Sequence, residues 1–427
     1  MSVQVSKLSN GVTVVTDHMP HLESAALGIW VKSGARDERE DQHGIAHLLE
    51  HMAFKGTNSR SARDIAEQIE SVGGEVNAAT SVETTCFYAR VMKDDVPLAI
   101  DILSDILLNS TFEEDELRRE QHVILQEIGA ALDSPEDVVF DQFQTAAFGD
   151  QAIGRTILGT PETVAGFTPD DIRDYLNTHY HGANMVLSAA GAVDHDAIVK
   201  AAEARLSQFA PEPAEPPVEG HYVGGETLTS RDLKETQIVL GFEGRAYHVR
   251  DFYASQVLAV LLGGGMSSRL FQEIREKRGL CYSVYAFHWG FSDTGVFGVH
   301  AATGEEDVPE LMPVLLQELA SISDNIEQKE VERARAQIRS SLMMSMESPA
   351  SRAGQIARQI LLYGRPVPNE ELLERLGAIS RERLMDLSGR LFHESGPTVS
   401  AIGPVDTVMR SQDIADHLSA GARVAAQ

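Results

Sequence analysis

His47, Glu50 and His51 have residue types and a spacing that could hold a metal ion. On an α-helix, His47 and His51 lie one turn apart, so both imidazoles project from the same face. Two such nitrogens suit a tetrahedral site, and zinc is the usual occupant of histidine-rich sites with an oxygen ligand. Glu50 lies on nearly the same face, where a carboxylate can hold and deprotonate a water molecule at the metal. The order H-x-x-E-H is the inverted form of the H-E-x-x-H zinc motif.

An ordinary polar helix face is the alternative interpretation of this pattern, since two histidines and a glutamate at this spacing occur by chance on many helices. The neighbouring residues favour the metal site. Leu48, Leu49, Met52 and Phe54 make the rest of the expected helix apolar, which predicts that the helix is buried. Histidines and a carboxylate inside a buried helix need polar partners, and a metal ion would supply one.

A third protein ligand is available on a helix expected from about residue 113 to 131. Glu120 and Glu127 are two turns apart on it and share one face. Glu127 lies in the more apolar part, residues 123–128, where an unpaired carboxylate would be costly. For Glu127 alone, the alternative is a solvated helix face.

With these residues in place, the chain resembles the pitrilysin/insulinase family of zinc peptidases, in particular its short-chain, processing-peptidase-like branch. The resemblance implies that His47, His51 and Glu127 bind one Zn²⁺ per chain, and that Glu120 supports one of these ligands without binding the metal itself. It implies that Glu50 is the general base of a zinc-dependent endopeptidase. Such an enzyme hydrolyses peptides or small unfolded polypeptides in an enclosed chamber.

The same resemblance assigns a substrate-binding strand. Residues 75–91 are expected to form two strands around a short turn, and Asn77 and Ala78 match the family's pair on an exposed edge strand beside the metal. A peptide substrate would add to that edge as a further strand, with main-chain hydrogen bonds supplying affinity. The alternative is an ordinary hairpin that tolerates an asparagine.

The second half of the chain carries a further pair. In the family, an arginine and a tyrosine seven residues apart bind the peptide backbone and help to stabilise the oxyanion. Arg275 and Tyr282 fit this spacing and the Gly/Leu-x-Tyr ending of the family motif, so we favour them as catalytic residues. Arg278 and Tyr285 have the same spacing and compete with them, and a surface charge cluster beside a core tyrosine is the alternative to both.

An internal repeat predicts two domains. When residues 181–194 are placed over residues 393–406, His, Ser, Ala, Gly, Val and Asp coincide at a constant offset of 212. Shifting the metal motif by the same offset gives no ligands, so only the first copy would bind zinc. We therefore expect two homologous α+β domains in tandem, each an antiparallel-rich sheet covered by helices. The expected boundaries are a zinc-binding catalytic domain at 1–208, a Pro-rich linker at 209–225, and a non-zinc domain with the Arg/Tyr pair at 226–427.

The periodicity and capping residues of the first half predict the elements that carry these residues. The expected strands are 11–16, 24–32 and 184–193 besides the pair in 75–91, and the expected helices are 61–70, 96–108, 113–131, 135–148, one from 168, and 194–206.

Composition restricts the partners and the compartment. The formal net charge is −28, which argues against nucleic acids and anionic membranes as partners. Acidic residues that line a cavity would favour basic peptides, and the alternative is that most of this charge is an ordinary acidic surface. No apolar run approaches the ~18 residues of a membrane helix, and the first residues resemble no targeting peptide. The two cysteines, Cys86 and Cys281, are expected to be free thiols of a reducing compartment, and a cytoplasmic location is the default.

Short-chain members of the resembled family assemble as two-subunit clamshells. The chain has both the zinc motif and the Arg/Tyr pair, so we expect a homodimer in which Arg275 and Tyr282 act in trans on the partner's zinc. Two alternatives remain: a processing peptidase with one dedicated substrate and a required partner chain, and a non-catalytic structural homologue.

Overall fold

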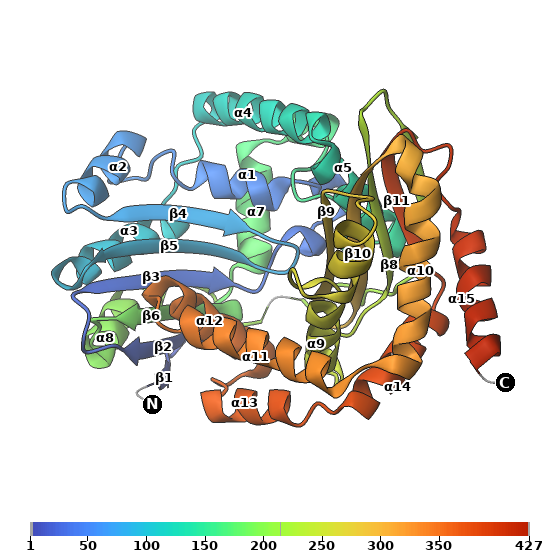
Figure 1. Cartoon of the computed structure of the whole chain (residues 1–427). Coiled ribbons are helices and arrows are strands. Elements are labelled where there is room, and N and C mark those ends of the chain that lie inside the picture. Colours follow the sequence, from blue (N-terminus) through green and yellow to red (C-terminus); the bar gives the residue numbers. More distant parts are fainter. Residues whose placement is uncertain (1–2, 214, 426–427) are drawn as a thin grey trace. The chain divides into compact units, whose positions relative to one another are not determined.

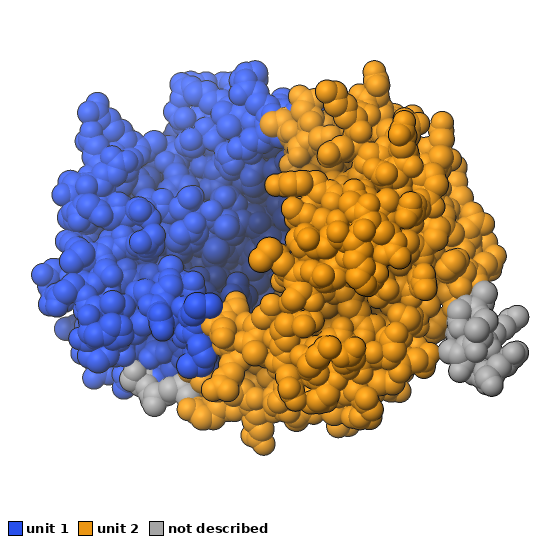
Figure 2. Space-filling model, viewed as in Figure 1, with its two compact units in different colours: residues 1–129, 155–218, 343–368 blue, residues 130–154, 219–342, 369–427 orange. Residues whose placement is uncertain are grey.

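The computed structural model describes residues 3–213 and 215–425 of the 427-residue chain (Figure 1). The chain forms two compact units, coloured separately in Figure 2. Unit 1 comprises residues 1–129, 155–218 and 343–368, and unit 2 comprises residues 130–154, 219–342 and 369–427. Each unit contains a mostly antiparallel sheet with helices packed on it, which confirms the predicted α+β class. The clamshell dimer stays a prediction.

The sheet of unit 1 has six strands. All neighbours in it are antiparallel except β2 and β6. In spatial order the strands are β1 (Val3–Lys7), β2 (Thr13–His18), β6 (Met185–Gly191), β3 (Ser24–Val31), β5 (Thr85–Met92) and β4 (Glu75–Thr80). The predicted strands near residues 11–16, 24–32, 75–91 and 184–193 are thereby confirmed, and β4 lies at an edge of the sheet.

The sheet of unit 2 has five strands, antiparallel except for β7 and β11. In spatial order they are β7 (Gly225–Ser230), β11 (Thr398–Gly403), β8 (Glu235–Glu243), β10 (Gly295–Gly304) and β9 (Ser283–Gly290). This order and its strand directions repeat those of β2, β6, β3, β5 and β4 in unit 1. β11 ends 212 residues after β6, so the repeat seen in the sequence is also a repeat of topology.

Helices cover both faces of each sheet. In unit 1, α1, α2, α3 and α8 pack toward one face around the main apolar core, and α12 packs on the other face of β2, β6 and β3. The helices of this unit, with α4 ending just beyond it, are α1 (Ile45–Met52), α2 (Ala62–Glu70), α3 (Val96–Leu108), α4 (Glu114–Asp133), α6 (Pro161–Gly166), α7 (Pro169–His179), α8 (His195–Leu206) and α12 (Pro349–Tyr363).

In unit 2, α9, α10 and α14 build the core on one face of the sheet, and α5 covers β7, β11 and β8 on the other. The helices of this unit, including most of α11, are α5 (Pro135–Phe148), α9 (Phe252–Gly263), the π-helix η6 (Phe271–Glu276), α10 (Val308–Asn325), α11 (Gln328–Ser345), α13 (Asn369–Gly377), α14 (Arg381–His393) and α15 (Ser411–Ala425). Single-turn 3₁₀ segments are η1 (Ala35–Asp37), η2 (Glu40–Gln42), η3 (Lys93–Asp95), η4 (Ala152–Gly154), η5 (Gly182–Asn184) and η7 (Glu305–Asp307).

Each half of the chain contributes one helix to the sheet built mainly by the other half. α5 comes from the first half and packs in unit 2, where Phe143 lies on Gly241 so closely that a Cβ there would meet its ring at 2.4 Å. α12 comes from the second half and packs in unit 1, where the buried Arg352 binds Asp17 Oδ2 at 2.6 Å. The compact units are therefore not contiguous in the sequence, because a helix can bury its apolar face on a sheet distant in sequence. The domain boundaries at 1–208 and 226–427, with a linker at 209–225, stay a prediction.

Side-chain caps fix the starts of several predicted helices. Ser61, Thr168 and Asp194 each accept a hydrogen bond from the backbone N–H three residues later, at α2, α7 and α8. α1 is shorter than the apolar segment 43–57 suggested and ends at Met52, so Phe54 lies in the following loop.

Two further expectations concern the whole chain. Cys86 and Cys281 are free thiols, as predicted, and they belong to different units. Within residues 3–213 and 215–425, every helix is too short or too polar to cross a membrane.

Candidate metal centre

Helix α1 presents an apolar face to the core of unit 1 and a polar face that carries the metal motif. Ile45, Leu48 and Met52 are completely buried, and α1 packs against α7 and the edge strand β4. The side chains of His47 and His51 are 12% and 17% exposed, so both imidazoles lie at the boundary between the core and solvent. The helical periodicity of α1 thus places the residues that pack in the core on one face and the candidate metal ligands on the other.

Helix α4 brings the third candidate ligand to the same point. Glu127 Oε2 lies 3.7 Å from Nε2 of His47 and 3.6 Å from Nε2 of His51. One ligand atom from each of the three residues lies within 4.8 Å of the others, and among the described residues this is the only such group of three. The structure thus brings together the three residues that the sequence proposed as metal ligands.

The geometry fits a zinc ion. Donor atoms about 2.0–2.1 Å from a tetrahedral zinc are separated by about 3.4 Å, close to the distances found here. Burial, reinforced by the neighbouring His51, lowers the pKa of His47 to about 4, so its imidazole is neutral and available as a ligand at neutral pH. Nδ1 of His47 is buried without a hydrogen-bond partner, which leaves Nε2 to face Glu127. Two imidazoles and one carboxylate form a donor set that zinc accepts.

Glu120 contacts the candidate ligand His51 from the side away from Glu127, and its supporting role stays a prediction. Its Oε2 accepts a hydrogen bond from Nδ1 of His51 at 3.0 Å, and its Oε1 binds Nζ of Lys55 at 2.6 Å. A proton held on Nδ1 leaves Nε2 of His51 as the free nitrogen, directed at Glu127. Lys55 was not identified from the sequence, because only the fold brings the loop after α1 against α4.

Glu50 is on α1 beside the candidate ligands and belongs to none of the ion pairs formed by the described residues. Its charge contributes to raising the pKa of Cys86 and of Tyr88, both on β5, although burial is the larger cause in each case. The carboxylate is therefore close enough to β5, the strand next to the edge strand, for its charge to act there. A carboxylate without a fixed partner is suited to accept a proton from a water molecule at the metal.

The start of α1 depends on a carboxylate that sequence reasoning missed. Glu38 is 3% exposed, and its two oxygens accept hydrogen bonds from the backbone N–H groups of Gly44 at 2.8 Å and Ala46 at 2.9 Å. Burial raises the pKa of Glu38 to about 8, while these two N–H groups act in the opposite direction. Gly44 has φ +96° and a Cβ there would lie 2.7 Å from Gly159, so only glycine fits this helix start. The signal in the sequence for this role of Glu38 is an acidic residue shortly before the metal motif.

Asn77 and Ala78 lie on β4, which pairs only with β5 and leaves its other edge unpaired within the sheet. Asn77 is exposed, whereas Ala78 is only 6% exposed, so the two side chains point to opposite faces of the sheet. A cavity of about 520 Å³ lies beside this strand and is lined by Asn77, Tyr88 and the apolar side chains of Phe54 and Ile65, among others. The strand that the sequence assigned to substrate thus has both a free edge and an adjacent hollow.

Arg275 and Tyr282 belong to unit 2, where the structure brings them together. The guanidinium carbon of Arg275 lies 4.9 Å from the centre of the Tyr282 ring, in a cation–π contact, and Tyr282 is 78% exposed. The competing pair is separated: Arg278 binds Glu273 at 2.9 Å, and Tyr285 packs in an aromatic cluster with His300. Of the two pairs with equal spacing, only Arg275 and Tyr282 are in mutual contact.

Comparison with known proteins identifies the family. The model of the insulinase family, peptidase family M16, matches residues 13–161, and the model of the inactive domain of M16 peptidases matches residues 166–338. The chain belongs to this family of peptidases. The tandem arrangement agrees with the metal motif lying in the first half and with its absence from the second.

Relatives within the family cover nearly the whole chain. An uncharacterized zinc protease of Rickettsia felis is 39% identical over 94% of this chain and 98% of its own length. A probable mitochondrial-processing peptidase subunit beta of Arabidopsis thaliana is 34% identical over 97% of this chain and 80% of its own length. A chain in the structure of complex III2 from Candida albicans, bound to Inz-5, has the same fold, with a TM-score of 0.87 and 22% identity over 98% of this chain and 100% of its own.

Proposed function

We propose that this chain is a zinc-dependent endopeptidase that hydrolyses peptides or small unfolded polypeptides. The observation that carries the proposal is the convergence of His47 Nε2, His51 Nε2 and Glu127 Oε2, with Glu50 on the same helix as the two histidines. Relatives that cover almost the entire chain are named zinc proteases, which supports zinc as the cofactor. We propose one ion per chain because the described residues contain one such group of ligands.

A zinc ion held by these three side chains would polarise a peptide carbonyl and lower the pKa of a water molecule at its fourth position. Glu50 accepts the proton of the attacking water and then delivers it to the leaving amine. Glu120 keeps His51 oriented through the Nδ1 hydrogen bond at 3.0 Å. Tyr282 donates a hydrogen bond to the developing oxyanion, and Arg275 holds the peptide backbone.

The substrate would bind as an extra strand along the free edge of β4. Backbone hydrogen bonds to this strand give affinity without strict sequence selection. Asn77 supplies a polar side chain at that edge, and the adjacent cavity of about 520 Å³ accepts a substrate side chain. The net charge of −28 favours basic peptides through long-range attraction.

A dedicated processing peptidase is the second candidate function. The relative from Arabidopsis thaliana, named as a processing peptidase subunit, favours it. In that case the purified chain would be inactive alone and would gain activity only with a partner chain. A non-catalytic structural role would leave the assembled set of ligands without a purpose, so we rank it below both.

Within the main proposal, the active form is a homodimer in which Arg275 and Tyr282 act on the partner's metal centre. Mixing a Glu50→Gln chain with a Tyr282→Phe chain tests this arrangement. Action in trans restores one intact site in each mixed dimer, so activity recovers on subunit exchange. Absence of recovery, when mass spectrometry shows mixed dimers, would exclude it.

Cleavage of an internally quenched basic peptide of about 15 residues tests the proposed function. The purified wild type should cleave it, and Glu50→Gln should lose at least about 10³-fold in kcat/KM because the general base is removed. Glu83→Gln, at an ion pair with Arg36 in the same unit, is the matched control and should retain activity. No cleavage by the wild type alone, with cleavage after addition of a partner subunit, would favour the processing peptidase.

A further inference from the structure

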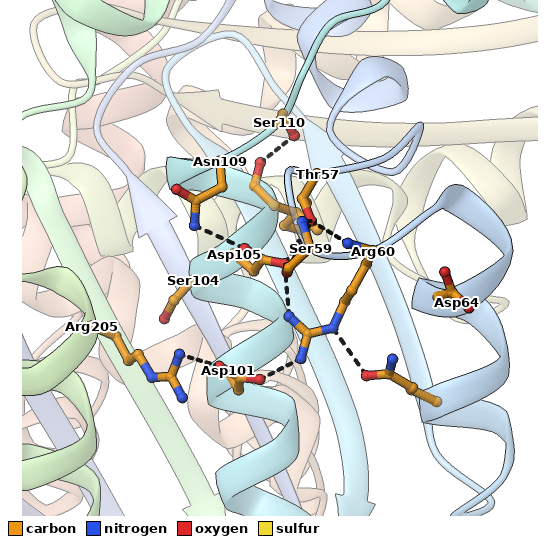
Figure 3. A network of polar contacts seen from close by, with 12 residues as sticks. Thr57, Ser59, Arg60, Asp64, Asp101, Ser104, Asp105, Asn109, Ser110 and Arg205 are labelled. Atoms are coloured by element: carbon orange, nitrogen blue, oxygen red, sulfur yellow. Dashed lines mark hydrogen bonds and ion pairs between the residues drawn. The ribbon is translucent and has the colours of Figure 1, made fainter.

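We propose that the buried carboxylate of Asp105 is a positioning residue for the metal centre. It holds the loop that follows α1 against the turn that precedes α4, and so fixes the helix with the two histidines relative to the helix with Glu120 and Glu127. The inference rests on the metal centre proposed above and extends it to a polar cluster outside that centre (Figure 3).

Asp105 lies on α3 and is 7% exposed. Its Oδ2 accepts hydrogen bonds from Thr57 Oγ1 at 2.7 Å, Ser59 Oγ at 2.9 Å and Arg60 Nη1 at 2.7 Å, all in the loop after α1. Its Oδ1 accepts a hydrogen bond from Asn109 Nδ2 at 2.8 Å, at the end of α3. One carboxylate therefore joins the segment that leads away from the metal-binding helix to the segment that leads toward α4.

The remaining members of the cluster balance its charge. Arg60 also binds Asp101 and donates from Nε to Gln68 Oε1 at 3.0 Å, and Asp101 binds Arg205 as well. Two aspartates thus face two arginines. Asp105 and Arg60 are the most buried of these four side chains, so removing the charge of Asp105 leaves the Arg60 guanidinium without one of its two carboxylate partners.

The two segments held by Asp105 also pair through their backbones in a short ribbon. Thr57 and Ser110 form an isolated β-bridge, flanked by hydrogen bonds from Asn58 N to Asn109 O at 3.0 Å and from Thr111 N to Gly56 O at 3.1 Å. One strand of this ribbon follows the end of α1, and the other lies just before the start of α4. The spacing between the two helices is therefore set where the ribbon forms.

The turn into α4 adopts a backbone conformation that the surrounding contacts must hold. Phe112 has φ +51° and is 5% exposed, and it is the only residue other than glycine with a positive φ in the described chain. A bulky residue in the left-handed region is strained and persists only where its neighbours over-determine the conformation. Phe112 directly follows the ribbon, so the Asp105 cluster and the buried phenyl ring fix this turn together.

Small changes at this turn are magnified at the metal centre. At a rise of 1.5 Å per residue, Glu127 lies about 20 Å along α4 from the turn. A tilt of the α4 axis by about 5° at the turn would therefore move the Glu127 carboxylate by roughly 2 Å. Gln121 holds the middle of α4 by donating to Val164 O at 2.9 Å and Phe167 O at 3.0 Å. Because this second attachment remains, we expect loss of Asp105 to weaken metal binding without abolishing it.

Zinc affinity of Asp105→Asn, measured by competition with a chromogenic chelator on the full chain, tests the inference. We expect the Kd for Zn²⁺ to rise about 10-fold, within the range found when supporting residues of metal sites are removed. The visible spectrum of the Co²⁺-loaded variant should also change, because the ligand geometry changes. A wild-type Kd and spectrum in Asp105→Asn would overturn the inference.

Asp17→Asn is the matched control. It breaks the buried ion pair with Arg352 in the same unit but touches neither segment of the ribbon, so it should lower the Tm and leave the Kd unchanged. If Asp17→Asn raises the Kd as much as Asp105→Asn does, at an equal loss of Tm, the change in zinc binding is a general effect of stability. That result would overturn the inference. If Asp105→Asn does not fold, Thr57→Val is measured instead, because it removes a single donor to the Asp105 carboxylate. A wild-type Kd in Thr57→Val would also overturn the inference. Failure of the wild type to bind zinc would instead overturn the proposed function.

Discussion

Nδ1 of His51 lies 3.0 Å from Oε2 of Glu120, and this contact leaves Nε2 of the same ring facing Glu127 at 3.6 Å. The two nitrogens of one imidazole thus have different partners on the same helix, α4. Glu120 is 6% exposed, and Lys55 binds its other oxygen. The contact sets both the direction of the ring and the nitrogen that is free for a metal.

Replacing Glu120 with glutamine should therefore weaken zinc binding about 10- to 100-fold, because the amide is a weaker acceptor for the Nδ1 proton. The Kd for Zn²⁺ is the measurement. Glu116→Gln, on the same helix at an ion pair with Arg119, is the control and should bind zinc like the wild type. Equal affinities for both variants would contradict the assigned role of Glu120.

Tyr282→Phe should lower kcat about 10²- to 10³-fold with little change in KM, since the hydroxyl acts on the oxyanion and not on the bound substrate. The phenyl ring can keep its contact with Arg275. Tyr285→Phe tests the competing pair and should behave like the wild type, because Tyr285 packs against His300. Steady-state kinetics on both variants decide between the pairs, and a larger defect in Tyr285→Phe would reverse the assignment.

A substrate that binds as a strand on β4 should respond to backbone methylation with a period of two. Every second N–H of such a peptide donates to the neighbouring strand. Single N-methyl groups at alternate positions should raise KM about 10-fold, and the positions between them serve as internal controls. A uniform response along the peptide would argue against binding at the strand edge.

The stability of unit 2 should increase with pH between about 4 and 6.5 because of His300. This side chain is 1% exposed, and burial lowers its pKa to about 4. Between that value and the ordinary value of 6.5, the unfolded chain binds more protons than the folded one, so stability is lost as the pH falls through this window. The expected loss at pH 5 relative to pH 7 is on the order of 1–2 kcal/mol.

His300→Phe should remove this part of the pH dependence while keeping the stacking on Phe140. Urea unfolding at pH 5 and pH 7 measures the pH dependence of the free energy of unfolding. In a Trp30→Phe background the remaining tryptophan, Trp289, lies in unit 2 beside Phe140 and reports on that unit. An unchanged pH dependence in His300→Phe would assign the effect to other groups.

Local patterns in the sequence were sufficient to predict most elements and the candidate ligands. Ser61, Thr168 and Asp194 mark helix starts through contacts three residues away, so their signal lies within a short segment. The histidines share one turn of α1, and Glu127 stands out as a carboxylate in an apolar part of its helix. These features depend on periodicity, which the sequence displays directly.

Features that depend on packing between distant segments were not predictable in this way. The apolar face of α5 could pack on either sheet, and Gly241 accepts Phe143 only in the folded unit. Lys55, Glu38 and Asp105 have partners on other elements or loops, and no regular spacing links them to those distant partners. The packing of α5 in unit 2 and of α12 in unit 1 also depends on contacts between segments that are distant in the sequence.

The central claim is that Glu127 holds zinc while Glu50 does not. Zinc content per chain, measured by mass spectrometry on dialysed Glu127→Gln, Glu50→Gln and wild type, tests it most directly. We predict about one zinc per chain in the wild type and in Glu50→Gln, and less than about a tenth of that in Glu127→Gln. Equal zinc content in the two variants, or none in the wild type, would contradict the account.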